Sequence, residues 1–330
     1  MHKLHGFLIM TVLLLNPGVS SAAIRYDEER PLTSLHGPSK QNPMSQLDAV
    51  LDGLLVDSAE GPRTIVLYVH GRGNEPKKSF QDTMFTSGFV LKKLERQNVS
   101  VLGYNWKSKI KPMRLCDRPV AEARSGAKGL RRLIADLDRH KRANDPRWKG
   151  RRVVLLAHSM GGIVVAEAMQ DPATSQVAKD LFDIIIVSAS DEPVQGHVAW
   201  QERMPEGKVY VLSNPGDRFL RRSMACEKGG AATRLGLISA SETSVPRSAT
   251  TTYIEVPAGN RHRYISRGAQ EGNPNTCAVV TTLLRGNQPT LAATWRIGGG
   301  PARFSIPAGK DPRDRCFVGA EDESGDDKDS

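Results

Sequence analysis

The sequence predicts a single-domain α/β protein built on an open, mostly parallel, doubly wound sheet. Three observations support this prediction: apolar runs of strand length alternate with segments of helix length, the 330 residues contain no internal repeat, and no linker divides the chain. Strands that alternate with helices favour a parallel sheet with helices on both faces. The composition, 39% hydrophobic and 25% charged residues, excludes collagen-like, wholly disordered and polytopic membrane proteins.

Six apolar runs carry the strand signal. The first, TIVLYV at residues 64–69, is β-branched and wholly apolar, as expected for a strand buried on both faces of a parallel sheet. The other predicted strands are 99–104, 152–157, 183–188, 208–212 and 251–256. Because ligands bind outside the carboxyl ends of the strands in such sheets, the strand-to-helix junctions are where chemistry is expected.

Four helices are predicted between and after these strands. The longest has apolar residues three and four positions apart, which gives one buried face and one very basic face. The predicted helices are 79–97, 119–142, 160–169 and 276–284.

The flanking regions have compositions of their own. Residues 1–22 read as a signal peptide: Lys3 is followed by an apolar run at 7–15, too short to span a bilayer, and then by small residues at 20–23. We therefore expect an exported chain, periplasmic or extracellular, with no transmembrane segment after cleavage; an uncleaved N-terminal anchor is the alternative. The remaining predicted regions are a leader at 23–60, the α/β domain at 61–288, a β excursion at 289–319 and an acidic, disordered tail at 320–330.

The net charge of +10 does not by itself indicate a nucleic-acid partner. The basic residues are scattered over helix faces, and no DNA-binding motif accompanies them. We expect no nucleic-acid binding, whereas attraction to an anionic envelope surface is compatible with this charge. The four cysteines, an even number in an exported chain, predict two disulfides, and three pairings of Cys116, Cys226, Cys277 and Cys316 are open.

The junction after strand 152–157 carries the clearest chemical signal. Its sequence, AHSMG, places Ser159 on the tight strand-to-helix turn called a nucleophile elbow, with Ala157 in place of the first glycine of G-x-S-x-G. Small flanking residues are needed because a larger side chain at Ala157 or Gly161 would strike the neighbouring backbone. The Met160 N–H at the helix start is a candidate oxyanion donor. A purely structural turn is the alternative.

A second oxyanion donor is expected after strand 64–69, where His70 and Gly71 begin a glycine-rich loop. The backbone N–H of Arg72 is our candidate, and a glycine-rich turn without function is the alternative. His70 is expected to shape this loop rather than to take a proton.

The base and the acid follow from chain order, which in this architecture is Ser, acid, His. His262 lies just beyond the last of the six strands, whereas His197 comes too early, and His158 is expected to be structural. Asp217, after strand 208–212, is the favoured acid. Asp191, after the preceding strand, is its rival, and a helix N-cap is the alternative for either.

Over residues 62–286 the chain resembles serine hydrolases of the α/β-hydrolase fold, and more narrowly a bacterial family of little-characterised α/β hydrolases. That family usually has Gly before the His and Ser after it, whereas Arg261 and Arg263 flank His262 here and make the site mouth more basic. The matching segments are 70–71, 106–108, 157–161, 213–220 with Ser223, 234–236 and 262–264.

The resemblance implies hydrolysis of an ester or amide through an acyl-enzyme, without a metal or organic cofactor. We expect an esterase or lipase-like enzyme acting on a small-molecule or lipid acyl ester. An acyltransferase with the same residues and a non-catalytic envelope binding protein are the alternatives. Four aromatic residues are candidates for lining an acyl pocket, with core packing as the other interpretation: Phe85, Phe89, Trp106 and Trp200.

Overall fold

The computed structural model describes residues 23–27, 51, 55, 64–72, 98–108, 116, 118–143, 146–226, 232–259, 261–262 and 273–308. The predicted signal peptide, the predicted helix at 79–97 with Phe85 and Phe89, Cys316 and the acidic tail lie outside these residues. In the described part of the chain, no helix combines the length and the apolar character needed to cross a membrane.

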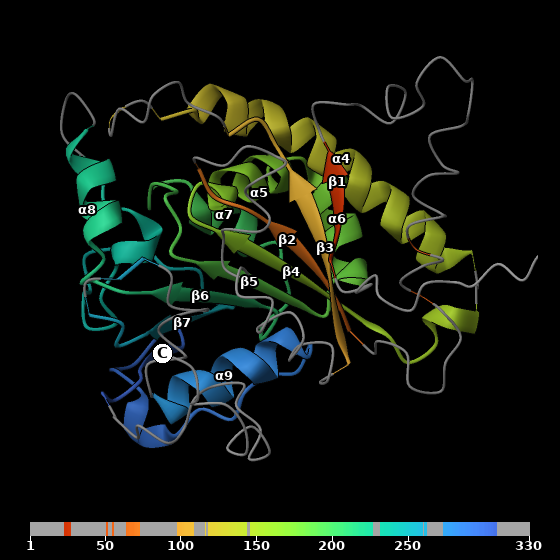
Figure 1. The fold of residues 1–330 in the computed structure, drawn as a ribbon. Coiled ribbons are helices and arrows are strands. Elements are labelled where there is room, and N and C mark those ends of the chain that lie inside the picture. Colours follow the sequence, from red (N-terminus) through yellow and green to blue (C-terminus); the bar gives the residue numbers. More distant parts are fainter. Residues whose placement is uncertain are drawn as a thin grey trace, which may run out of the picture.

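A parallel sheet forms the centre of the molecule (Figure 1). Its strand order in the described residues is β1-β3-β2-β4-β5-β6-β7-β8, and all seven pairings between neighbours are parallel, which confirms the predicted α/β fold. The strands are β1 Ala23–Asp27, β2 Thr64–Val69, β3 Val99–Asn105, β4 Arg152–His158, β5 Ile184–Ser188, β6 Val209–Ser213, β7 Thr251–Glu255 and β8 Arg303–Ser305.

Helices cover both faces of the sheet (Figure 1). Ile65, Leu67 and Val69 of β2 belong to the core cluster beneath α4 to α7, whereas Val66 and Tyr68 belong to the cluster beneath α9. Successive residues of a strand point to opposite faces, so a wholly apolar strand is required here. The helices are α4 Val120–Arg142, α5 Gly161–Met169, α6 Pro172–Leu181, α7 His197–Gln201, α8 Arg218–Ala225 and α9 Pro274–Leu284.

Five of these strands and helices were not anticipated individually: β1, β8, α6, α8 and α7, a helix of five residues. The outermost strands β1 and β8 pair with β3 and β7, so parts of the leader and of the C-terminal excursion belong to the sheet. Both strands are short, with five and three residues, and are therefore too short to show a clear hydrophobic periodicity in the sequence. Helices α6 and α8 begin with good caps, Asp171 before Pro172 and Asp217 before Arg218, and such start signals are present in the sequence.

The sheet topology brings two junctions together. From β2 the chain moves to β3 on one side, then crosses back to β4 on the other side of β2. Val69 at the end of β2 pairs with Ala157 near the end of β4. The change of direction between β2 and β4 is a topological switch point, where open parallel sheets form a crevice.

Candidate active site

Ser159 lies at the switch point, between β4 and α5. Its φ of 56° places it in the left-handed region, which non-glycine residues rarely adopt and which costs roughly 1–3 kcal/mol. Three backbone hydrogen bonds hold the turn. The Ser159 N–H donates to the Ser188 carbonyl (3.1 Å), and the Ser159 carbonyl accepts from the N–H groups of Asp191 (3.1 Å) and Gly162 (3.0 Å). The strained residue is therefore fixed by the end of β5.

The glycines after Ser159 are required by close packing, as the sequence indicated. A Cβ at Gly161 would collide with the carbonyl oxygen of Val69, and a Cβ at Gly162 would collide with the hydroxyl of Ser190. The α5 helix thus begins directly against the ends of β2 and β5.

The Met160 N–H lies between the turn and the helix. Met160 is the N-terminal cap residue of α5 and is 1% exposed. Among the described residues its N–H has no hydrogen-bond acceptor. A buried N–H without an acceptor is unusual in proteins, and at the start of a helix it favours an anion.

The loop after β2 packs directly on Ser159. A Cβ at Gly71 would lie 2.8 Å from the Cβ of Ser159, so only glycine lets the chain approach this closely. His70 fixes the loop, because its Nδ1 lies 2.7 Å from the Gly71 carbonyl oxygen and its Nε2 accepts from the Trp106 N–H (3.3 Å). His70 therefore carries its proton on Nδ1 and shapes the backbone that leads to Arg72.

His262 and Asp217 form a hydrogen-bonded pair. The His262 Nδ1 lies 2.7 Å from the Asp217 Oδ2, and the two side chains are 14% and 0% exposed. The other Asp217 oxygen, Oδ1, accepts from the N–H groups of Phe219 (2.8 Å) and Leu220 (3.0 Å). The two interpretations of Asp217, partner of the histidine and helix cap, are therefore both satisfied, each by one carboxylate oxygen.

Aromatic contacts join this pair to the elbow and to the loop after β2. The His262 ring lies 4.9 Å from the ring of His158 and stacks on Phe219 at 4.8 Å. The guanidinium of Arg72 lies over the Phe219 ring, 5.7 Å from the ring centre. His158 also contacts the His262 carbonyl through Nε2 (3.3 Å), which agrees with a supporting role.

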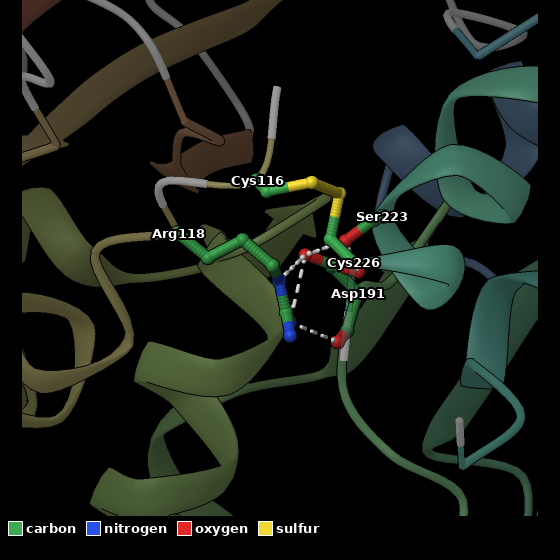
Figure 2. The surroundings of a disulfide bond; sticks show 5 residues. All are labelled: Cys116, Arg118, Asp191, Ser223 and Cys226. Atoms are coloured by element: carbon green, nitrogen blue, oxygen red, sulfur yellow. Dashed lines mark hydrogen bonds and ion pairs between the residues drawn. A yellow bond between two sulfur atoms is a disulfide. The ribbon is translucent and has the colours of Figure 1, made fainter. Parts of the chain in front are cut away.

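Asp191, the rival acid, has other partners (Figure 2). Its carboxylate accepts from Arg118 (3.0 and 3.1 Å) and from the Ser223 hydroxyl (2.8 and 3.0 Å), and lies 3.3 Å from Arg234. Asp191 and both arginine side chains are almost fully buried. The acid thus compensates two buried cations and holds α8 through Ser223.

Next to this cluster a disulfide joins Cys116 to Cys226, the residue that ends α8 (Figure 2). Cys277 is also disulfide-bonded. The structure thus selects the Cys116–Cys226 pairing among those left open by the sequence. The bond ties α8, which carries Asp217 at its start, to the segment before α4.

Removing this disulfide is expected to lower the free energy of unfolding by about 2–5 kcal/mol, because it closes a loop with a sequence separation of 110. The measurement is urea unfolding of a Cys116→Ser/Cys226→Ser variant beside the wild type. The double variant leaves the disulfide of Cys277 in place, so the measurement reports the contribution of the Cys116–Cys226 disulfide alone. An unchanged unfolding midpoint would contradict a stabilising role for this bond.

The other candidates lie in the core. His197 is buried, its Nε2 lies 3.0 Å from the Tyr253 hydroxyl, and burial lowers its pKa to about 4. Trp106 and Trp200 are each 1% exposed. Trp106 stacks on His70, and the Trp200 Nε1–H donates to Glu192 (3.4 Å). The two tryptophans therefore pack in the core, and Phe85 and Phe89 lie outside the described residues.

Phe219 lies in the matching segment 213–220, but reasoning from sequence assigned it no role at the site. It is 40% exposed and is the exposed large hydrophobic residue of the described part. Its position two residues after a candidate acid, on the first turn of a helix, was the available signal.

This fold and this arrangement of residues define an α/β hydrolase. The family model "Alpha/beta hydrolase of unknown function (DUF900)" matches residues 53–263, more than half of the chain, and the chain belongs to this family. No curated protein matches the sequence.

Three solved structures are similar to this chain at low identity and low TM-score. An esterase from Pyrococcus furiosus is 12% identical, with a TM-score of 0.35, over 68% of this chain and 84% of that one. A cold-adapted esterase from an Arctic intertidal metagenomic library is 13% identical (TM-score 0.37; 69% and 83%). An alpha-beta serine hydrolase homologue from Coxiella burnetii is 12% identical (TM-score 0.34; 69% and 86%). Similarity at this level carries no argument about activity.

Proposed function

We propose that the protein is an exported serine hydrolase that cleaves carboxylic esters through an acyl-enzyme on Ser159. The observation that carries the proposal is the 2.7 Å contact between His262 Nδ1 and Asp217 Oδ2. The His262 ring lies 4.9 Å from the ring of His158, the residue before a serine held on a left-handed turn. Membership of an α/β-hydrolase family supports hydrolysis.

In the proposed first step the Ser159 Oγ attacks the ester carbonyl. With a proton on Nδ1, donated to Asp217, the His262 ring presents an unprotonated Nε2 that accepts the serine proton. Asp217 stabilises the resulting imidazolium and keeps the ring oriented. The imidazolium then gives its proton to the departing alkoxide, which leaves as the alcohol while the acyl group stays on Oγ.

The oxyanion of the tetrahedral intermediate is assigned to the N–H groups of Met160 and Arg72. The Met160 N–H has no acceptor among the described residues, and the Gly71 contact brings the loop with Arg72 against Ser159. Loss of one such donor typically costs about 3 kcal/mol of transition-state stabilisation. In the second step His262 takes a proton from water as the water oxygen attacks the acyl carbonyl. The His262 imidazolium then returns this proton to Ser159 Oγ as the bond between Oγ and the acyl group breaks, which releases the acid and restores the free enzyme. Side chains, backbone and water suffice for this chemistry, which uses neither a metal nor an organic cofactor.

The proposal is tested by stopped-flow hydrolysis of 4-nitrophenyl esters of increasing acyl length. A burst of nitrophenolate equal to the enzyme concentration, followed by a slower steady state, is the expected signature of an acyl-enzyme. Intact-mass detection of the acylated protein during the steady state identifies the intermediate. Absence of turnover with every ester by a folded protein would contradict the proposal.

Export rests on the predicted signal peptide and is supported by the Cys116–Cys226 disulfide, since such bonds persist in oxidising compartments. N-terminal sequencing of the protein from a periplasmic or culture-medium fraction tests it. A mature chain that starts near Ala23 is expected, and an uncleaved chain confined to the cytoplasm would contradict export.

A Gly71→Ala substitution is expected to lower ester turnover about 100-fold. The added methyl group would lie 2.8 Å from the Ser159 Cβ and push the loop with Arg72 away from the serine, and a displacement of about 1 Å costs this much in rate. The measurement is kcat on 4-nitrophenyl acetate. Gly196→Ala is the matched control, because a Cβ there meets nothing within 4 Å. Equal rates in the two variants would contradict the oxyanion assignment.

A further inference from the structure

The surroundings of His262 combine an exposed aromatic ring with several cations. Phe219 stacks on His262 on one side, and the Arg72 guanidinium lies 5.7 Å from its ring centre. A cation within about 6 Å of an aromatic ring is attracted to it. A substrate that reaches Ser159 past His262 therefore meets an apolar ring and a positive charge together.

More positive charge follows on the exposed face of α8. Arg218 lies between Asp217 and Phe219 in the chain, and both of these residues contact His262, so the backbone of Arg218 lies next to the candidate site. Arg222 lies one helical turn further on, and both side chains are exposed. In the part of the chain that the structure describes, no carboxylate lies within ion-pairing distance of either residue.

Among the residues that the structure describes, the acids near His262 do not neutralise this charge. Asp217 is bound to His262 and to two N–H groups of α8. Asp191 is bound to Arg118 and lies beside Arg234 in the interior. The guanidinium of Arg221 donates to the Pro215 carbonyl (2.6 and 3.1 Å), a neutral acceptor, so its charge adds to the others.

Arg218 does not stabilise the helix on which it lies. It is the first residue of α8, which has no acidic residue in its first turn. The N-terminus of a helix carries a partial positive charge, and a cation there is unfavourable by a few tenths of a kcal/mol. A negatively charged ligand would offset this cost, because it would be attracted to Arg218 and to the neighbouring cations.

We propose that the site prefers esters whose acyl or alcohol part carries an anionic group, a carboxylate or a phosphate, next to an apolar chain. The guanidinium groups of Arg218 and Arg222 bind the anion, and the Phe219 ring packs on the adjacent hydrocarbon. This proposal rests on the ester hydrolysis assigned to Ser159 and specifies its substrate class.

The test compares two soluble esters with the same number of carbons. The mono-4-nitrophenyl ester of adipic acid has a terminal carboxylate, and 4-nitrophenyl hexanoate has none. The expected kcat/KM for the adipate ester at low ionic strength is about tenfold higher, because a hydrogen bond to a charged group contributes this much. The preference is expected to fall as salt is added, whereas hexanoate turnover is expected to respond little, because exposed charges are screened.

Two variants test whether the preference for the anionic ester depends on Arg218 and Arg222. Arg218→Gln/Arg222→Gln is expected to bring the ratio of the two kcat/KM values close to one. The variant removes an unfavourable cation from the start of α8 and a favourable one from its last turn, so the two small effects on helix stability oppose each other and the fold is expected to persist. Arg285→Gln is the matched control: Arg285 is exposed, and its carbonyl contacts Thr64 at the amino end of β2, the opposite edge of the sheet. A ratio that falls equally in both variants, or in neither, would overturn the proposal.

A second pair of substrates identifies the source of the anion. Vesicles of phosphatidylglycerol, whose headgroup is anionic, are compared with vesicles of zwitterionic phosphatidylcholine. A preference among the soluble esters alone indicates a small anionic ester, and a preference for phosphatidylglycerol that the double variant loses indicates a lipid. Equal rates within both pairs, with hexanoate still hydrolysed, would overturn the substrate class while leaving ester hydrolysis intact. No hydrolysis of any substrate would overturn both proposals.

Discussion

Replacing Ser159 with alanine is expected to lower kcat for activated esters about a millionfold, the loss found when the nucleophile of such a site is removed. The nucleophilic oxygen is lost, while the turn that presents it persists. The hydrogen bonds that hold this turn are made by the backbone of residue 159, not by its side chain. The measurement is steady-state hydrolysis of 4-nitrophenyl acetate by wild type and variant.

Two controls make this result specific. The unfolding free energy of Ser159→Ala is expected to stay within about 1 kcal/mol of the wild type, since only a hydroxyl is removed. Ser190→Ala removes a hydroxyl from the packing around α5 and is expected to keep most of the activity. Undiminished turnover in folded Ser159→Ala protein would contradict the nucleophile assignment.

Replacing Asp217 with asparagine is expected to lower kcat about 10⁴-fold. The amide oxygen can still accept from the N–H groups of Phe219 and Leu220, and asparagine is as good a helix cap as aspartate. The amide NH₂ then faces His262 Nδ1 and donates to it, which moves the imidazole proton to Nε2. The ring can no longer accept the proton of Ser159, so the loss falls on kcat with little change in fold.

The rival acid supplies the control for this experiment. Asp191→Asn weakens the compensation of the buried Arg118 and Arg234 and is expected to reduce the unfolding free energy by about 3 kcal/mol. Turnover per folded molecule is expected to remain within about tenfold of the wild type, because Asp191 bonds to Arg118 and Ser223. A larger kcat loss in Asp191→Asn than in Asp217→Asn would assign the catalytic acid to Asp191 instead.

Much of the fold could be predicted because the central strands are buried on both faces. Such strands read as apolar runs, and β2 was expected with the bounds that the structure has, Thr64–Val69. The sequences of the outer strands β1 and β8, AIRYD and RFS, are not apolar runs. Their pairing depends on neighbouring strands distant in sequence, β3 and β7, which local patterns do not reveal.

The candidate site was predictable to the extent that it depends on chain order. Ser159, Asp217 and His262 each follow a strand, and strands of a parallel sheet end at one edge, so their order along the chain was informative. The surroundings of Asp191 were not predictable, because Arg118, Ser223 and Arg234 reach it from three separate segments. The stacking of Phe219 on His262 depends likewise on the direction of α8.

The measurement that tests the central claim most directly is labelling of the mature protein with a fluorophosphonate, followed by mass spectrometry of its peptides. A fluorophosphonate reacts with a serine only where a neighbouring base activates it. The account predicts one equivalent of label on Ser159, and none in Ser159→Ala or His262→Ala protein. Label on another serine, or no label on well-folded wild-type protein, would contradict it.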